Sequence, residues 1–415
     1  MAKAVVDAIL DGGTVAAETT TGPDGRFELE LTPASYTLRA VVNSTTIADA
    51  RVEADAAAMA SVELKSGRFI SSTSGGAVKG IPSLTPSSGQ IVRVFYATDR
   101  EPNPVRSAIG WGYGKERSKS GELSYGSCLV SIPRDHKLGT LESPSLWSFD
   151  LTPTAGKYVV VTRVTKETEP EFYHDVSSKL QASGSRRALV FVHGFNVTFT
   201  DAARRTAQIA YDLGFDGAPI LYSWPSQGSV DGYPADEESV QWTVTHLRSF
   251  LENVARESGA TTIQLVAHSM GNRALLNAIS QLSTRANRPR FREVILAAPD
   301  IDAGVFSQLV AAVRSSSDRI TLYASSGDKA LVVSRKFHSF SRAGESGDNL
   351  TIVRGVDTVD ASKVDTSLLG HSYYGDNRVV LHDMFDLIRY DLPPEHRFGL
   401  EKQQKAIGSY WTFRE

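Results

Sequence analysis

Short apolar segments alternate with longer amphipathic segments through the second half of the chain, and this alternation constrains the fold more than any other feature. The apolar segments are four or five residues long and are rich in Val, Ile and Leu. They are residues 188–192, 219–222, 263–266, 294–297, 320–323 and 350–353. Continuous apolar segments of this length predict parallel strands that are buried on both faces of a sheet.

The segments between these strands have the period of helices. One helix is predicted by an apolar stripe that recurs at steps of three and four residues from Val240 to Val254 and that Gly259 ends. Others are expected at about 200–213, 272–282 and 303–313. Repeated strand-helix-strand units predict an α/β fold, with a mostly parallel, doubly wound sheet and helices on both faces. In such sheets the ligand site lies at the carboxyl ends of the strands.

The predicted site centres on the turn Ala267-His268-Ser269-Met270-Gly271, which follows the strand at 263–266. A helix is expected directly after it, so Ser269 stands in a sharp strand-to-helix turn, where small residues two before and two after the serine avoid collision with the backbone. The turn presents the hydroxyl of Ser269 as a nucleophile and the amide of Met270 as an oxyanion donor. A serine in an ordinary polar turn is the alternative, and the position between strand and helix favours the nucleophile.

A serine needs a histidine as base and a carboxylate that orients this histidine. In strand-turn-helix sites of this kind the order along the chain is Ser, Asp or Glu, then His. Asp328 lies in a small-residue loop after the strand at 320–323, and His371 lies in the long loop after 350–353, so both are chosen as catalytic partners. Asp300 and Asp302 follow an earlier strand and are the alternative acids, although they are also suited to cap the next helix.

The second oxyanion donor is expected from the loop after the first core strand, in Val192-His193-Gly194-Phe195-Asn196. Gly194 allows close approach of the backbone, and the amide of Phe195 donates. His193 precedes the serine and breaks the catalytic order, so it is interpreted as a residue that shapes the loop. The residues expected to line the substrate pocket are His193, Gly194, Tyr222, Trp224 and His268.

The first third of the chain has the two-residue period of exposed strands, at 27–31 and 36–40, with turns rich in Pro and Gly between them. This predicts a small all-β sandwich at 1–66, followed by a Ser- and Gly-rich linker at 67–90 and a catalytic domain at 91–415. Further strands are expected at 91–97, 123–132 and 158–164. The Gly-rich segment 107–120 is expected to be a polar loop that is able to move.

Composition excludes several classes of function. The 44 basic and 47 acidic residues give a net charge of −3, which argues against nucleic acid as a partner. Cys128 is the only cysteine, so neither an intrachain disulfide nor a thiolate metal cluster is expected. No apolar run is long enough to span a membrane. The start of the chain lacks a signal peptide, which fits a cytoplasmic protein or a secreted one whose leader is missing from this sequence.

Two resemblances to known families add to this interpretation. The segment from Thr21-Gly22-Pro23-Asp24-Gly25 to Tyr36-Thr37-Leu38 resembles the carboxypeptidase-regulatory-like, or transthyretin-like, β-sandwich modules. About residues 90–392 resemble a bacterial family of α/β-hydrolases with lipase-like and esterase-like members. The motifs that carry this resemblance are Phe95-Tyr96-Ala97-Thr98-Asp99-Arg100, Ile132-Pro133-Arg134-Asp135-His136, Val192-His193-Gly194-Phe195-Asn196, Tyr222-Ser223-Trp224-Pro225 with Tyr233 and Asp236, and His268-Ser269-Met270-Gly271-Asn272-Arg273.

The second resemblance implies the α/β-hydrolase fold and hydrolysis of esters, with Ser269, Asp328 and His371 as the triad and the Trp224-Pro225 loop as a wall of the pocket. The expected function is that of a serine esterase or lipase that acts on a small ester or lipid-like substrate and needs no metal or organic cofactor. A peptidase or amidase with the same triad, and a catalytically silent binding protein of this fold, are the alternatives.

Overall fold

The computed structural model describes residues 90–107, 109–143, 156–325, 340–362 and 378–414, together with the strands of the amino-terminal segment. By its contacts the chain divides into two compact units, Met1–Ser83 and Leu84–Glu415. None of the described helices is long and apolar enough to cross a membrane.

The first unit is all-β in its described residues. Its strands are β1 (Val5–Leu10), β2 (Val15–Thr20), β3 (Ala34–Val42), β4 (Thr45–Ala54), β5 (Ser61–Lys65) and β6 (Arg68–Ser72). The first four form an antiparallel sheet in the order β2-β1-β3-β4, and β5 pairs with β6. The strand predicted at 36–40 lies within β3, whereas the one predicted at 27–31 falls outside the described residues. A sandwich and its bounds at residues 66 and 90 remain predictions.

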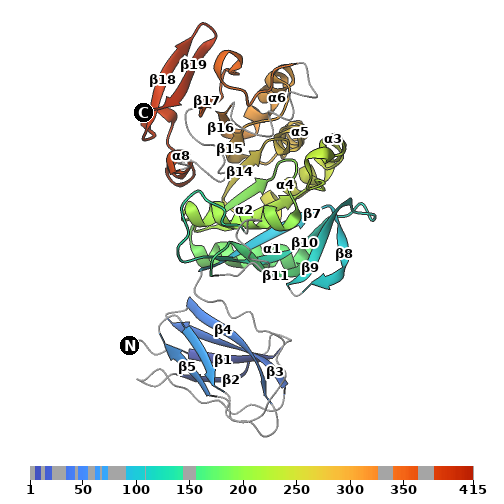
Figure 1. Cartoon of the computed structure of the whole chain (residues 1–415), viewed down its shortest axis with the longest axis vertical. Coiled ribbons are helices and arrows are strands. Elements are labelled where there is room, and N and C mark those ends of the chain that lie inside the picture. The colour runs from blue at the N-terminus through green and yellow to red at the C-terminus, as the bar shows by residue number, and fades with distance from the viewer. Residues whose placement is uncertain are drawn as a thin grey trace. The chain divides into compact units, whose positions relative to one another are not determined.

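The second unit is built on one sheet, whose described strands follow the order β18-β19-β17-β16-β15-β14-β12-β13-β7-β10-β11-β9-β8 (Figure 1). All neighbours from β19 to β7 pair in parallel, and β10 is antiparallel to both β7 and β11. The strands are β7 (Gln90–Thr98), β8 (Arg100–Ser107), β9 (Gly110–Arg117), β10 (Ser124–Ile132), β11 (Val160–Glu167), β12 (Arg187–Val192), β13 (Ala218–Ser223), β14 (Thr262–His268), β15 (Phe291–Ala297), β16 (Ser317–Ala324), β17 (Asp357–Asp360), β18 (Leu400–Lys405) and β19 (Gly408–Phe413).

Helices cover both faces of this sheet, which explains why its central strands are apolar throughout. Along β12, Val190 belongs to the core on one face and Leu189 and Phe191 to the core on the other. Helices α1, α4, α5 and α6 contribute to the first core, and α2 and α8 to the second. The described helices are α1 (Glu169–Ser183), α2 (Phe199–Asp212), α3 (Tyr233–Trp242), α4 (Val244–Glu257), α5 (Gly271–Ser283), α6 (Ala303–Ser315) and α8 (Arg378–Tyr390), with 3-10 turns η1 (Val230–Gly232), η2 (Gly347–Asn349) and η3 (Pro394–His396). The predicted doubly wound α/β fold is confirmed.

Three local predictions are wrong. Residues 350–353 are not a strand. The strand that pairs with β16 is β17, at Asp357–Asp360. Leu350 packs into the core from an irregular segment. The helix predicted from Val240 to Val254 is two helices, α3 and α4, which part at Thr243. At this position the buried hydroxyl of Thr243 makes hydrogen bonds with Asp99 and Tyr222.

The segment 107–120, expected to be a loop, is mostly strand. Residues Gly110–Arg117 form β9, which pairs with β8 in an antiparallel hairpin. Trp111 and Tyr113 are two positions apart, so they face the same side of the strand and pack against the core. Helix α1, for which no prediction is made above, begins with a capping box in which Thr168 and Glu171 exchange hydrogen bonds.

Candidate active site

Ser269 lies at the junction of β14 and α5 with a strained backbone. Its φ is +50°, in the left-handed region that residues other than glycine rarely adopt. The strain is held by hydrogen bonds on both sides of the turn. The Ser269 N–H donates to the carbonyl of Ala297 (3.0 Å), and its own carbonyl accepts from the N–H of Asp300 (3.1 Å) and the side-chain amide of Asn272 (2.9 Å). Neighbouring segments therefore determine the direction of the serine side chain.

The loop after β12 runs directly against this turn. A Cβ atom placed on Gly194 would lie 3.0 Å from the Cβ of Ser269, and one placed on Gly271 would lie 2.3 Å from the carbonyl oxygen of His193. Only glycine allows the second approach without a backbone shift. The close contact brings together, next to Ser269, the two segments from which oxyanion donors are predicted.

The polar groups around Ser269 are available for a ligand. Its Oγ atom is buried and makes no hydrogen bond to another described residue. Within the same part of the chain, the backbone N–H groups of Met270 and Phe195 donate to no other residue. A buried hydroxyl and two unengaged amides are the kinds of group that attack on a carbonyl and stabilisation of an oxyanion require.

The two catalytic partners chosen for Ser269 lie outside the described residues. Asp328 belongs to the segment 326–339, which follows β16, and His371 belongs to 363–377, which follows β17. Their roles as acid and base therefore remain predictions. The strand that precedes His371 is β17 rather than the one predicted at 350–353.

The alternative acids have structural partners. The carboxylate of Asp300 is buried and accepts from the hydroxyl of Tyr233 (2.7 Å), and it pairs with Arg273 (3.1 Å) and Arg342 (3.3 Å). Asp302 caps α6 and accepts a hydrogen bond from the N–H of Val305 (2.9 Å). These contacts give both carboxylates a role in holding the segment after β15.

The residues predicted to line the pocket are mostly buried near the turn. The ring of His193 stacks on Trp224, with centroids 5.1 Å apart, and the Trp224 indole N–H donates to the His193 carbonyl (2.7 Å). The hydroxyl of Tyr222 contacts Thr243 (2.7 Å) rather than the serine. The side chain of His268 lies beside Gly194. A Cβ atom placed on Gly194 would be 2.9 Å from the Nδ1 atom of His268.

Two buried charged residues near the site have no predicted role, although both stand in the motifs quoted above. Arg100 begins β8 and reaches His193 and Val197, and Asp236 of α3 accepts from the N–H groups of Asn196 (3.1 Å) and Gln227 (2.7 Å). Burial raises the pKa of Asp236, and these hydrogen bonds oppose the rise. Charged residues are mostly exposed in folded proteins, so their residue types alone do not indicate that Arg100 and Asp236 are buried near the site. Only their positions in the quoted motifs point to them.

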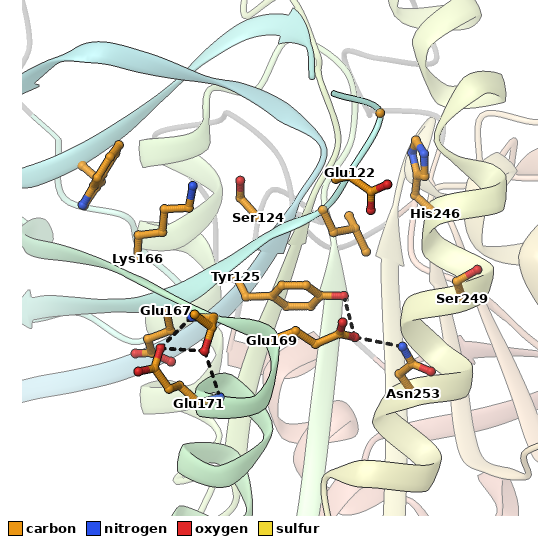
Figure 2. A pocket seen from close by; sticks show the side chains of 14 residues that line it. Glu122, Ser124, Tyr125, Lys166, Glu167, Glu169, Glu171, His246, Ser249 and Asn253 are labelled. Atoms are coloured by element: carbon orange, nitrogen blue, oxygen red, sulfur yellow. Dashed lines mark hydrogen bonds between the residues drawn. The ribbon is translucent and has the colours of Figure 1, made fainter. Parts of the chain in front are cut away.

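A pocket of about 780 Å³ lies at a different place in the sheet (Figure 2). Figure 2 shows the hydroxyl of Tyr125 and the side-chain amide of Asn253 directed at Glu169, at 3.1 and 3.0 Å. His246, which pairs with the buried Asp99 (2.9 Å), also lines it. Strands β12, β13 and β7 stand between β14 and β10, and no predicted site residue is among the lining residues, so this pocket is separate from the surroundings of Ser269.

Comparisons with known proteins agree with this geometry. Residues 168–389, more than half of the chain, match the family described as "Alpha/beta hydrolase of unknown function (DUF900)". No curated protein matches the sequence.

Among solved structures, a lipase-esterase related protein from Clostridium acetobutylicum ATCC 824 is 12% identical, and the match covers 42% of this chain and 85% of that one with a TM-score of 0.22. A prolyl endopeptidase is also 12% identical, and the match covers 82% of this chain and 59% of that one with a TM-score of 0.27. Neither TM-score is high enough to support a conclusion about function. The match over residues 168–389, together with the strand order and the turn at Ser269, shows that the chain belongs to the α/β-hydrolase family of unknown function.

Proposed function

We propose that the protein is a serine hydrolase of carboxylic esters, with Ser269 as its nucleophile. The observation that carries this proposal is the strained turn itself. Ser269 is held at φ +50°, its buried hydroxyl has no partner among the described residues, and two unengaged amides flank it. A strained backbone is costly, so it persists where the surrounding structure enforces it, most often at functional sites.

In the proposed reaction, Ser269 Oγ attacks the ester carbonyl while His371 takes the hydroxyl proton. The carbonyl oxygen becomes an oxyanion, which the N–H groups of Met270 and Phe195 bind. Removal of one such donor typically costs about 3 kcal/mol of barrier stabilisation. Collapse of the tetrahedral intermediate expels the alcohol, which receives the proton from His371 and leaves an acyl-enzyme on Ser269.

Water completes the cycle by attacking the acyl-enzyme, with His371 again acting as the base. Asp328 stays ionised throughout and orients His371. The proposed substrates are small esters or lipid-like esters. A Ser269-dependent peptidase or amidase differs in its leaving group, so a panel of matched ester and amide substrates distinguishes the two activities.

The test compares the wild type with Ser269→Ala on short p-nitrophenyl esters, with labelling by a fluorophosphonate probe as a second readout. Loss of a triad serine lowers kcat by about 10⁶-fold, so turnover by the variant is expected to be close to background, and its labelling absent. The matched control is Ser307→Ala on the exposed face of α6, which should keep both signals. Turnover that survives in Ser269→Ala removes this serine from the mechanism.

A further inference from the structure

We propose that Arg100 is a positioning residue for the oxyanion hole, and that it acts through His193 to set the direction of the Phe195 N–H group. The inference rests on the proposed function for its consequence in catalysis. The structural part stands on hydrogen bonds between β8, the loop after β12 and the end of β13.

Arg100 is a buried cation with an unusual set of partners. It is 1% exposed, and its Nε atom donates to the hydroxyl of Ser223 (2.9 Å). Its Nη1 atom donates to the carbonyls of Gly114 (3.1 Å) and Ser226 (3.0 Å), and its Nη2 atom donates to the carbonyl of Val197 (2.7 Å). The same Nη2 atom lies 3.4 Å from His193 Nε2. These five partners match the five N–H groups of a guanidinium, and all of them are uncharged.

The contact with Arg100 determines the tautomer of His193. A guanidinium only donates, so the Nε2 atom of His193 accepts from Arg100 and carries no proton. The hydroxyl of Ser223, which accepts from Arg100 Nε, lies 3.2 Å from the same Nε2 atom and donates to it. The remaining proton is then on Nδ1, which lies 2.7 Å from the carbonyl oxygen of Gly194 and donates to it. Burial, and next the charge of Arg100, hold the pKa of His193 well below its usual value, so the ring stays neutral.

The Gly194 carbonyl and the Phe195 N–H group belong to one planar peptide unit. In a trans peptide these two groups point in opposite directions, so a hydrogen bond that fixes the carbonyl also fixes the N–H. None of the described residues has a cis peptide bond. The donor from His193 therefore aims the Phe195 N–H away from the His193 ring, and it also polarises the peptide in the sense that strengthens this N–H as a donor.

Several other backbone groups of the loop are also held by hydrogen bonds. The carbonyl of His193 accepts from Trp224, the N–H of Asn196 donates to Asp236, and both backbone groups of Val197 are bound, by Ser226 and Arg100. Only the Phe195 N–H, among the backbone N–H groups of Phe195, Asn196 and Val197, donates to no other described residue. The Phe195 N–H is thus free beside groups on both sides that are fixed, as preorganised stabilisation of an oxyanion requires.

The charge of Arg100 has an effect on His193 beyond the structural role of its five hydrogen bonds. Burial lowers the pKa of Arg100 to about 10, partly offset by Asp99 and Asp236 nearby, so the side chain is still a cation at neutral pH. A buried charge without a direct carboxylate partner is costly, and a neutral amide with two N–H groups would serve at most two of the five partners of Arg100. The charge adds one property that an amide lacks, since it excludes both the imidazolium and the Nε2-protonated form of His193.

The test combines NMR with kinetics on the full chain. With ¹⁵N-labelled histidine, the signal of His193 is identified by its loss in His193→Phe. We expect a neutral ring that is protonated on Nδ1 and does not titrate between pH 5 and 9, and a mixture of tautomers in Arg100→Gln. An Nε2-protonated ring, or titration near pH 6.5, overturns the proposal. This measurement is decisive even if the protein hydrolyses no ester, and that failure would count against the proposed function alone.

The kinetic arm separates the donor from the ring. His193→Phe keeps a ring to stack on Trp224 but loses the N–H, and His193→Asn keeps an N–H in reach of the Gly194 carbonyl. We expect His193→Phe and Arg100→Gln to lower kcat by about 10- to 100-fold, less than complete loss of a donor, with KM within about 3-fold. His193→Asn should remain within about 5-fold of the wild type.

The matched control is Arg204→Gln on α2, another largely buried arginine, whose partners are Val159, Glu142, Ser143 and Asp201. Its kcat should stay near that of the wild type. Equal losses in His193→Asn and His193→Phe, when both are folded by circular dichroism, would refute the proposal. If Arg100→Gln does not fold, the tautomer of His193 in the wild type still tests the step from Arg100 to the ring, and the two His193 variants test the step from the ring to the Phe195 N–H.

Discussion

His136 should make the stability of the hydrolase unit depend on pH above neutrality. Its side chain is 2% exposed and lies between two carboxylates, with Nδ1 2.8 Å from Glu142 and Nε2 2.7 Å from Asp212 at the end of α2. Burial lowers the pKa of His136, and the hydrogen bonds with Asp212 and Glu142 outweigh this effect and raise it from 6.5 to about 9. Both ring nitrogens therefore donate, and the ring is an imidazolium at pH 7.

The sign and size of the effect follow from linkage. A base whose pKa is higher in the folded state contributes stability that is fully present below pH 6.5 and is lost as the pH rises through about 9. At about 1.4 kcal/mol for each pH unit between the two values, the contribution is about 3 kcal/mol. His136→Gln removes this contribution and leaves the carboxylate of Asp212 buried without its cation.

The assay is urea unfolding followed by tryptophan fluorescence. All five tryptophans lie beyond residue 110, so the signal reports on the hydrolase unit and not on the first unit. The free energy of unfolding of the wild type should exceed that of His136→Gln by about 3 kcal/mol at pH 6, and the difference should shrink to about 1 kcal/mol or less at pH 10. His174→Gln, at an exposed position of α1, is the control and should match the wild type throughout. A difference between wild type and His136→Gln that stays constant from pH 6 to pH 10 refutes the reasoning.

Two further predictions concern the site. Gly271→Ala places a methyl group 2.3 Å from the carbonyl oxygen of His193, so the turn must move relative to the oxyanion loop. Ester turnover should then fall by about 100-fold or more. The control is Gly347→Ala, where a Cβ meets open space but φ is positive, and this variant should lose only stability. Comparable turnover in the two variants would argue against the tight contact. For the acid of the triad, Asp328→Asn should lower kcat by about 10⁴-fold, whereas Asp300→Asn should mainly lower the melting temperature. A p-nitrophenyl ester assay and thermal unfolding measure the two effects. The reverse pattern would assign the acid to Asp300.

The elements that the sequence predicts well are those whose environment is uniform. Strands β12 and β14 are covered by helices on both faces, so nearly every residue is apolar and the segments stand out. Strand β17 has only Thr358 and Val359 in its buried centre, with an aspartate at each end, and its apolar content is too low to mark it. Short strands and edge strands form because they pair and pack with neighbouring segments, and a local sequence pattern holds no information about those neighbours.

The break between α3 and α4 shows a second limit. Val240 and Val244 pack into the same core, so the apolar stripe runs through the break without interruption. At the break, the hydroxyl of Thr243 is bound to Asp99, more than a hundred residues away in the sequence. Such a contact is set by the tertiary structure and leaves no periodic trace.

The candidate site divides along the same line. The turn at Ser269 is a local structure, made by a strand, a helix and small residues in between, and its backbone conformation agrees with the prediction. The surroundings of the loop after β12 are assembled from distant segments, by Arg100 before it and by Trp224 and Asp236 after it. A buried arginine and an exposed one look alike in a sequence, so this network becomes visible only in three dimensions.

The carboxyl-terminal hairpin has a consequence for how copies of the protein meet one another. Strand β19 pairs in parallel with β17, and β18 lies outside it as the last strand of the sheet (Figure 1). Without the hairpin, the short β17 would expose unpaired N–H and C=O groups, which are a template for strand exchange with another chain. With the hairpin, the outermost strand carries the polar sequence Glu401-Lys402-Gln403-Gln404. Charged side chains on an outermost strand disfavour pairing with the strand of another chain, so the hairpin Leu400–Phe413 gives this end of the described sheet a protected edge.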